Sequence, residues 1–397
     1  MSISSDAKIR TQQFIIFQPD LIKFYYCFFR GATALPPMDN PGLPIQDEVC
    51  PFHMRMSYWA ETLQKNRVSE MQKNCERFQF LKYVNASFPN ITVIPPGTGV
   101  MHQVNLEYLA RIVMEKDDFL FPDFCIGTDA HTTLVNGLGV FGFSVGTLEA
   151  ESVMFDHPLA MKLPRIIGVK LIGKVPKLAT SMDVVLLVSK EIRKFVKSSE
   201  ELDIFVEFFG PAIDQLSIQE RSAISNSAGE YNAKMAFFPI DMKTLEYLEH
   251  TGREKHSLKI IKEYLELNGL LRTQQNQDQI QYDDVLEIFL PDIVVTISGP
   301  LRPKDKVELE DVAKDFSKNF PHFNGIFNLD IDGQFHSIKD GSVLLSSIAS
   351  CSNSSNPSVM LTAGLLAKKA VEAGLSVPKF VKRSLSPGND KSLSSEF

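Results

Sequence analysis

Cysteine is scarce in this 397-residue chain. The five cysteines include no CxxC pair and are scattered along the sequence: Cys27, Cys50, Cys75, Cys125 and Cys351. That distribution excludes a disulfide framework and a metal site built within one short motif. Free thiols persist in reducing compartments, so we expect the protein to be cytoplasmic.

Long apolar runs are also lacking. The most apolar segment, "FIIFQPDLIKFYYCFF" at 14–29, is interrupted by Pro19, Asp20 and Lys23. It falls well short of the ~20 apolar residues that a membrane-spanning helix needs. We therefore expect no membrane partner and no secretion signal.

Positive charge is not in excess, because 41 Lys and Arg stand against 48 Asp and Glu, for a formal net charge of −7. A chain with that balance has no overall field that attracts a polyanion. We expect no DNA partner, and any RNA would have to meet a local basic surface.

What the chain does have is a core-forming composition, with 44% hydrophobic and 22% charged residues. Short apolar runs such as "NITVIPPGTG" and "DIFVEFFGPA" alternate with helical patterns such as "QVNLEYLARIVM" and "ATSMDVVLLVSKEIRKF". This alternation predicts an α/β fold with a mostly parallel sheet. Within it, "PRIIGVKLIGKV" predicts a pair of strands.

Ligands of open α/β sheets gather at the carboxyl ends of strands, where we expect three polar clusters. In "GTDAHTTLVNGLG" (127–139), Asp129 stands two residues before His131, and glycines follow that let the backbone approach a ligand. The other two clusters are His102 with Gln103 in "PPGTGVMHQ", and Asn226 with Glu230 at helical spacing in "SNSAGE". Each also fits a plain interpretation as a turn histidine or a solvated helix face.

Two further segments favour chemistry. Cys351 lies in "SCSNSSNP", among small hydroxyl and amide residues that favour thiolate chemistry or metal ligation. A small buried residue before an Asn-Pro turn is the alternative. In "LRPKDK", Arg302, Lys304 and Lys306 form a local positive loop that suits phosphate contacts, or is simply solvated.

Four long motifs occur in one order: "GTDAHTTLVNGLGVFGFSVGTLEAESVM", "FVEFFGPA", "ISNSAGEY" and "SCSNSSNPSVMLTAGLLAKKA". In this order and spacing the sequence resembles the aconitase family, from around residue 50 to Gly388. "PPGTGVMHQVNLEYLARIV", "LEYLEHTGR" and "SGPLRPKDKV" resemble the iron-responsive-element-binding branch of that family most.

The resemblance implies aconitase-like three-layer α/β/α domains. We expect a divergent segment at 1–48, part of a first domain at 49–165, a second domain at 166–285, a shortened third domain at 286–388 and a tail at 389–397. The swivelling C-terminal domain of the family, with its serine base and carboxylate-binding arginines, is expected to be absent.

The family binds a four-iron–four-sulfur cluster through three cysteines, and one open iron binds citrate. By resemblance Cys351 is the first ligand, and the other two cysteines have no counterpart in this chain. The resemblance gives the substrate pocket as His102, Gln103, Asp129, His131, Asn226 and Glu230. Ala130 replaces a serine that donates a hydrogen bond to substrate in the family, so we expect an inherited but idle pocket.

The branch resemblance also implies contact with the loop of an iron-responsive hairpin RNA. It assigns that contact to Arg193, Ser298, Lys306 and Asn353. "VCPFHMRM" resembles a haem-sensing segment of the branch, with Cys50 and His53 as the expected haem ligands.

These observations favour a non-catalytic aconitase-fold protein of iron homeostasis with weak or vestigial RNA binding. Two alternatives stay open. One is an iron–sulfur hydro-lyase, an aconitate hydratase that interconverts citrate and isocitrate. The other is a shortened product without activity.

Overall fold

The computed structural model describes residues 14–17, 22–24, 76, 79, 83, 86–87, 105–116, 118–154, 157–177, 179–193, 204–273, 280–299, 306–322, 325–348 and 357–385. The chain forms two compact units, with Val104–Ile293 in the first and Val294–Phe397 in the second. The first unit also contains two N-terminal strands.

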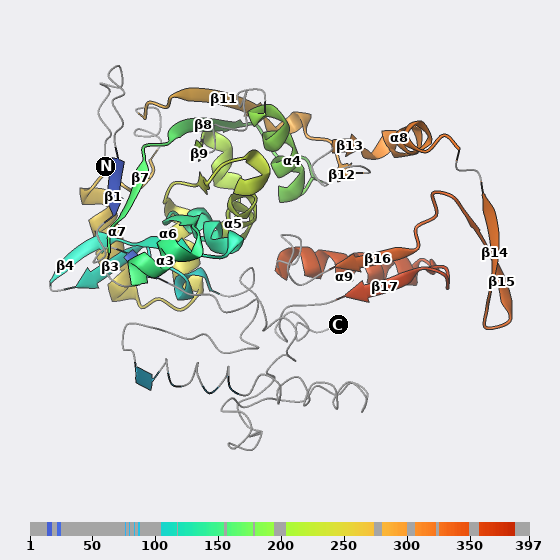
Figure 1. Ribbon diagram of the computed structural model, residues 1–397, viewed down its shortest axis with the longest axis horizontal. Coiled ribbons are helices and arrows are strands. Elements are labelled where there is room, and N and C mark those ends of the chain that lie inside the picture. The colour runs from blue at the N-terminus through green and yellow to red at the C-terminus, as the bar shows by residue number, and fades with distance from the viewer. Residues whose placement is uncertain are drawn as a thin grey trace. The chain divides into compact units, whose positions relative to one another are not determined.

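Two parallel sheets organise the first unit (Figure 1). One has the order β10-β9-β8-β11 and the other the order β2-β5-β6, and all neighbours in both are parallel. The strands of the unit are β1 (Phe14–Phe17), β2 (Ile22–Phe24), β3 (Val113–Lys116), β4 (Phe119–Pro122), β5 (Phe124–Gly127), β6 (Phe141–Ser144), β7 (Leu159–Lys162), β8 (Arg165–Ile172), β9 (Ile204–Phe209), β10 (Met235–Phe237) and β11 (Asp284–Phe289). β1 with β7, and β3 with β4, form antiparallel pairs.

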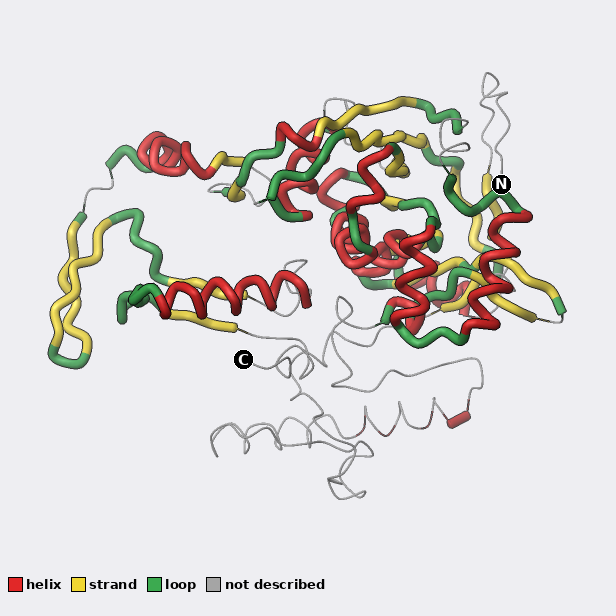
Figure 2. Tube along the Cα trace, turned by 180° about the vertical axis from the view of Figure 1, so that it is seen from behind, coloured by secondary structure: helices red, strands yellow, loops and turns green. Residues whose placement is uncertain are grey.

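Helices connect these strands, as the alternating colours of Figure 2 show. The α-helices of the first unit are α3 (Thr147–Met154), α4 (Ser181–Ile192), α5 (Ile218–Asn226), α6 (Met242–His250) and α7 (Lys255–Leu267). Short 3-10 helices lie between them: η3 (Leu106–Tyr108), η4 (Ala130–Leu138), η5 (Pro211–Gln215), η6 (Ala228–Tyr231) and η8 (Leu290–Asp292).

The main core lies between the four-stranded sheet and α4 and α5. Ile167 and Val169 of β8, Val188 of α4 and Ile224 of α5 are fully buried within it. β8 pairs with β9 on one side, from Arg165 to Lys170, and with β11 on the other, from Ile167 to Ile172. The sequence-based expectation of a strand pair in "PRIIGVKLIGKV" is therefore wrong, because this apolar run is one central strand.

The second unit holds shorter elements. Its strands are β12 (Thr296–Ser298), β13 (Lys306–Glu308), β14 (Ile326–Ile331), β15 (Gln334–Lys339), β16 (Leu345–Ile348) and β17 (Lys382–Leu385). Its helices are η9 (Leu309–Asp311), α8 (Val312–Asn319) and α9 (Pro357–Glu372). β16 and β17 are parallel, and α9 runs beside them in Figures 1 and 2, which makes a strand–helix–strand unit.

The predicted α/β class with parallel sheets is confirmed for the described residues. The finer domain division at 49–165, 166–285 and 286–388 stays a prediction. No helix within the described residues is long and apolar enough to cross a membrane.

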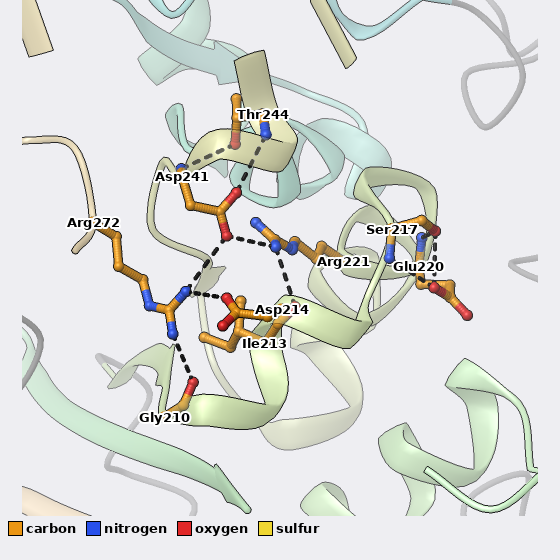
Figure 3. A network of polar contacts seen from close by, with 9 residues as sticks. All are labelled: Gly210, Ile213, Asp214, Ser217, Glu220, Arg221, Asp241, Thr244 and Arg272. Atoms are coloured by element: carbon orange, nitrogen blue, oxygen red, sulfur yellow. Dashed lines mark hydrogen bonds and ion pairs between the residues drawn. The ribbon is translucent and has the colours of Figure 1, made fainter. Parts of the chain in front are cut away.

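A buried ion network joins four elements of the first unit (Figure 3). Arg221 of α5 is fully buried, and its Nη2 donates to Asp241 Oδ2 at 2.7 Å and to the Ile213 carbonyl at 3.1 Å. Arg272, which follows α7, lies 3.6 Å from the same Asp241 oxygen and 2.6 Å from Asp214. A buried charge without a partner is costly. The packing of α5 against the start of α6 and the residues after α7 is therefore stabilised by these ion pairs.

Asp241 has a second task, since it is also the N-cap of α6. Its Oδ1 accepts from the Thr244 backbone N–H at 3.2 Å, while the Thr244 hydroxyl accepts from the Asp241 N–H at 3.3 Å. This capping box satisfies donors at the helix start that would otherwise be orphaned. One side chain thus starts α6 and pairs with two arginines, the second of which is also paired with Asp214.

We predict that Asp241→Asn lowers the free energy of unfolding by about 3–5 kcal/mol, because Arg221 is left as an uncompensated buried charge while an amide can still cap α6. Urea denaturation measures the change. Lys262→Met is the control, since the Lys262–Glu266 pair is half exposed and is expected to contribute below about 0.5 kcal/mol. A loss in Asp241→Asn no greater than in the control would contradict the role given to this network.

A half-buried carboxyl lies in the four-stranded sheet of the first unit. Glu207 of β9 stands in register between Gly168 of β8 and Phe237 of β10, and burial raises its pKa above the ordinary 4.5. Tyr282 covers Gly168, and burial and then the nearby Glu207 charge raise the pKa of its phenol. The nearest lysine along β8, Lys170, pairs with Glu287 at 3.3 Å.

The raised pKa means that the folded protein keeps this proton at a higher pH than the unfolded chain does. Its contribution to stability is therefore complete below pH 4.5 and is lost as the pH rises through the raised pKa. Gln stays neutral at every pH. We therefore predict that, at pH values above the raised pKa, Glu207→Gln has a higher melting temperature than wild type, and that its melting temperature depends less on pH. Glu287→Gln, at a side chain 62% exposed, is the control. Parallel pH profiles for wild type and Glu207→Gln would show that Glu207 is not the titrating group.

Candidate functional site

The Asp129–His131 loop begins at the carboxyl end of β5, in the parallel sheet of β2, β5 and β6. Asp129 is the N-cap of η4, and its Oδ1 accepts from the His131 backbone N–H at 2.8 Å. The same oxygen lies 2.5 Å from His131 Nδ1. Both side chains are about one quarter exposed, so solvent and small molecules can reach the pair. The structure therefore brings these two predicted site residues together.

The contact assigns roles to the ring nitrogens. An ionised carboxylate only accepts hydrogen bonds, so His131 Nδ1 must carry the proton that points at Asp129. In the neutral ring, Nε2 is then the nitrogen that accepts a proton. Asp129 thus fixes the tautomer and orientation of His131, as an acid/base histidine requires.

Asn136 holds the helix that carries this pair. Its side chain is fully buried, and Nδ2 donates to the carbonyls of Val140 and Gly142, each at 2.9 Å. Its Oδ1 accepts from the Ala236 N–H at 3.5 Å, and its backbone carbonyl accepts from Phe238 at 3.1 Å. Asn136 therefore links η4 to β6 of one sheet and to β10 of the other.

Two glycines let α5 and the chain after β10 approach η4 closely. A Cβ on Gly137 would lie 2.3 Å from the backbone nitrogen of Ser222, which is far inside contact distance. Gly139 ends η4 in the left-handed region with φ of 90°, and a Cβ there would meet Ile240. Both positions need glycine for steric reasons, and not for binding a ligand.

A second group of predicted residues lies where α4 and η6 meet. Glu230 is exposed in η6, and its backbone carbonyl accepts from the Ser189 hydroxyl at 2.7 Å. Arg193, the C-cap of α4, donates through Nη2 to the same hydroxyl at 3.4 Å. Asn226 is the last residue of α5, so Asn226 and Glu230 are on different helices, and the predicted single helix face is wrong.

Ser298 and Lys306 belong to the second unit. They are directly opposed in the antiparallel pair of β12 and β13. Ser298 is exposed and Lys306 is half-buried. Six predicted site residues lie outside the described part of the chain: Cys50, His53, His102, Gln103, Cys351 and Asn353.

Comparison with known proteins adds the decisive observation. The model of the aconitase family (aconitate hydratase) matches residues 40–392. The chain belongs to the aconitase family. It is 45% identical over 358 residues to aconitate hydratase A of Rickettsia felis, and 45% identical over 363 residues to aconitate hydratase A of Rickettsia conorii. Each alignment covers 88% of this chain and 40% of the relative, so the chain spans about two fifths of the length of these curated aconitases.

The described residues do not by themselves form a site for an iron–sulfur cluster. They contain no group of three or more His, Cys, Asp or Glu side chains that could hold a metal. Their cysteine, Cys125, is buried within β5, and its thiol donates to the Leu109 carbonyl at 3.8 Å. Cluster ligation by Cys351 and haem binding by Cys50 and His53 stay predictions, because these residues lie outside the described part of the chain.

Asn136 was not expected from the sequence. Its only local signal is the Asn-Gly dipeptide, which is typical of a turn and says nothing of the distant Ala236 and Phe238 backbones that it meets. The role of Asn136 can be seen only from the folded structure, in which it contacts β6 of one sheet and β10 of the other.

We predict that Asn136→Ala disturbs the Asp129–His131 contact at a distance. The change removes the hydrogen bonds that Asn136 makes to two carbonyls and one N–H, at a cost of about 1 kcal/mol for each bond, and more for any group left unpaired. The nitrogen NMR signals of the His131 ring should then lose the pattern of a single Nδ1-protonated tautomer. Leu148→Ala, at an α3 side chain 81% exposed, is the control. An unchanged ring signal in a folded Asn136→Ala protein would refute the positioning role.

Proposed function

We propose that this chain supplies a substrate-orienting wall of an aconitate hydratase, the hydro-lyase that interconverts citrate and isocitrate. The observation that carries the proposal is the Asp129–His131 pair at the carboxyl end of β5, in a chain 45% identical to proteins named aconitate hydratase A. The comparisons support this alternative better than a non-catalytic, RNA-binding role.

Within that function, the contributions of the described residues are orientation and proton handling. Asp129 presents His131 with Nδ1 protonated, so Nε2 can accept a proton or a hydrogen bond from a substrate hydroxyl or carboxyl. Ala130 between them offers no side-chain donor. The wall therefore orients a substrate, and the remaining groups of the reaction must come from elsewhere.

Citrate binding tests this proposal without turnover. We predict that citrate shifts the amide NMR signals of residues 127–131, and that His131→Gln and Asp129→Asn each weaken its affinity about tenfold, the effect of losing one well-oriented hydrogen bond. Lys259→Met on α7, at a side chain 74% exposed, is the matched control. Citrate that binds equally to all four proteins, or to none, would rule the proposal out.

Iron-responsive hairpin RNA is the second candidate ligand, and it belongs to the finer branch resemblance. The observation that favours it is the direct pairing of Ser298 in β12 with Lys306 in β13. This pairing brings a hydroxyl-bearing residue opposite a cationic residue on neighbouring protein strands. An RNA shift that depends on the hairpin loop at low salt, and that Lys306→Met weakens, would support this candidate. Equal binding to intact and loop-mutated hairpins would remove it.

A further inference from the structure

Glu207 of β9 lies on the face of the four-stranded sheet that is turned away from α4 and α5. Its neighbours Val206 and Phe208 belong to the core cluster beneath those helices, and side chains alternate along a strand. The Glu207 side chain is half-buried, and within the described residues it has no hydrogen bond and no ion pair. Burial accordingly raises the pKa of its carboxyl. Glu207 is therefore a carboxylate that a cation would stabilise.

Aromatic side chains border Glu207 along β9 and on β10. Phe205 and Phe209 lie two residues before and after it, on the same face of the sheet. Phe237 stands directly opposite it on β10. Phe205 is buried, whereas Phe209 and Phe237 are half-buried. The group is thus closed at one end and open to solvent at the other.

Tyr282 supplies a ring on the β8 side. Gly168 stands opposite Glu207 on β8, and a Cβ there would lie 2.4 Å from Tyr282 Cδ2. The Tyr282 ring therefore takes the place beside Glu207 that a side chain at position 168 would fill. Its centroid lies 5.0 Å from that of Phe209. Burial, and then the Glu207 charge, raise the pKa of its phenol above 10, so the ring stays neutral.

The cationic side chain on the same face of β8 is already engaged. Lys170 stands opposite Phe209, two residues beyond Gly168, and its Nζ donates to Glu287 Oε1 at 3.3 Å. No described side chain therefore pairs with the Glu207 carboxylate. A cation that pairs with it has to come from solution.

The surroundings of Glu207 select the kind of cation. Divalent metals need several oxygen ligands, and the described residues contain no cluster of metal-binding side chains. A primary ammonium or a guanidinium carries several N–H donors, which aromatic rings would leave without acceptors. A quaternary ammonium has no N–H group. Its methyl groups pack on rings, and its charge is attracted to both the ring faces and the carboxylate.

We propose that Glu207 and the surrounding rings of Phe205, Phe209, Phe237 and Tyr282 bind the trimethylammonium group of a small quaternary ammonium compound. The site uses no residue of the loop that carries Asp129 and His131, and it does not depend on the proposed function. Its chemistry differs as well, because it takes a cation, whereas the loop is proposed to orient a polycarboxylate.

Choline is a suitable probe. Its uncharged isostere 3,3-dimethylbutan-1-ol and the primary amine ethanolamine are the comparators. Each is titrated with the purified chain, and its proton NMR signals are followed, because aromatic rings shift the signals of methyl groups that lie against them. We expect choline to bind in the millimolar range and at least about tenfold more tightly than either comparator.

Variants test the carboxylate and the ring separately. Glu207→Gln keeps the shape and should weaken choline about tenfold, whereas Glu263→Gln on α7, at a side chain 59% exposed, is the matched control and should change nothing. Tyr282→Leu should weaken choline about threefold or more, and Tyr282→Phe should keep most of the affinity, since it retains the ring. Melting curves show that each variant is folded.

His131→Gln separates this inference from the proposed function, because it should weaken citrate and leave choline binding intact, while Glu207→Gln should do the reverse. Choline binding that depends on Glu207 and on an aromatic ring at position 282 supports the site. Absence of choline binding, equal binding of choline and 3,3-dimethylbutan-1-ol, tighter binding of ethanolamine, or unchanged affinity in a folded Glu207→Gln protein would overturn it.

Discussion

The carboxylate of Asp241, shared by two buried guanidinium groups, is the interaction on which the first unit depends. Arg221 brings α5 to it, Arg272 brings the chain after α7, and Asp241 itself starts α6. None of these charges is tolerable in the core without the others. Elements separated by up to 51 residues in sequence must therefore assemble together, and the network fixes where α5 lies.

The position of α5 in turn determines the position of the candidate site. Ser222, the residue after Arg221, packs against Gly137, so η4 is pressed directly onto α5. Asn136 then fastens η4 to both parallel sheets, and Asp129 caps its other end. The Arg221–Asp241 ion pair, the Ser222–Gly137 packing and the Asn136 hydrogen bonds thus together determine where η4, and with it His131, lies. A side-chain pair held in this way keeps its geometry before any ligand is bound.

The sequence predicted those parts of the molecule that local pattern controls. The alternation of apolar runs and helical periodicity predicted the parallel sheets, and the apolar run before Gly127 predicted that Asp129 and His131 follow the end of a strand. It did not predict the pairing of Arg221 with Asp241 or the anchoring role of Asn136, because the partners lie 20 and 100 residues away.

The sequence pattern gave a wrong prediction for Asn226 and Glu230. Their spacing of four residues is typical of one helix face, but α5 ends at Asn226 and Glu230 lies in the separate helix η6.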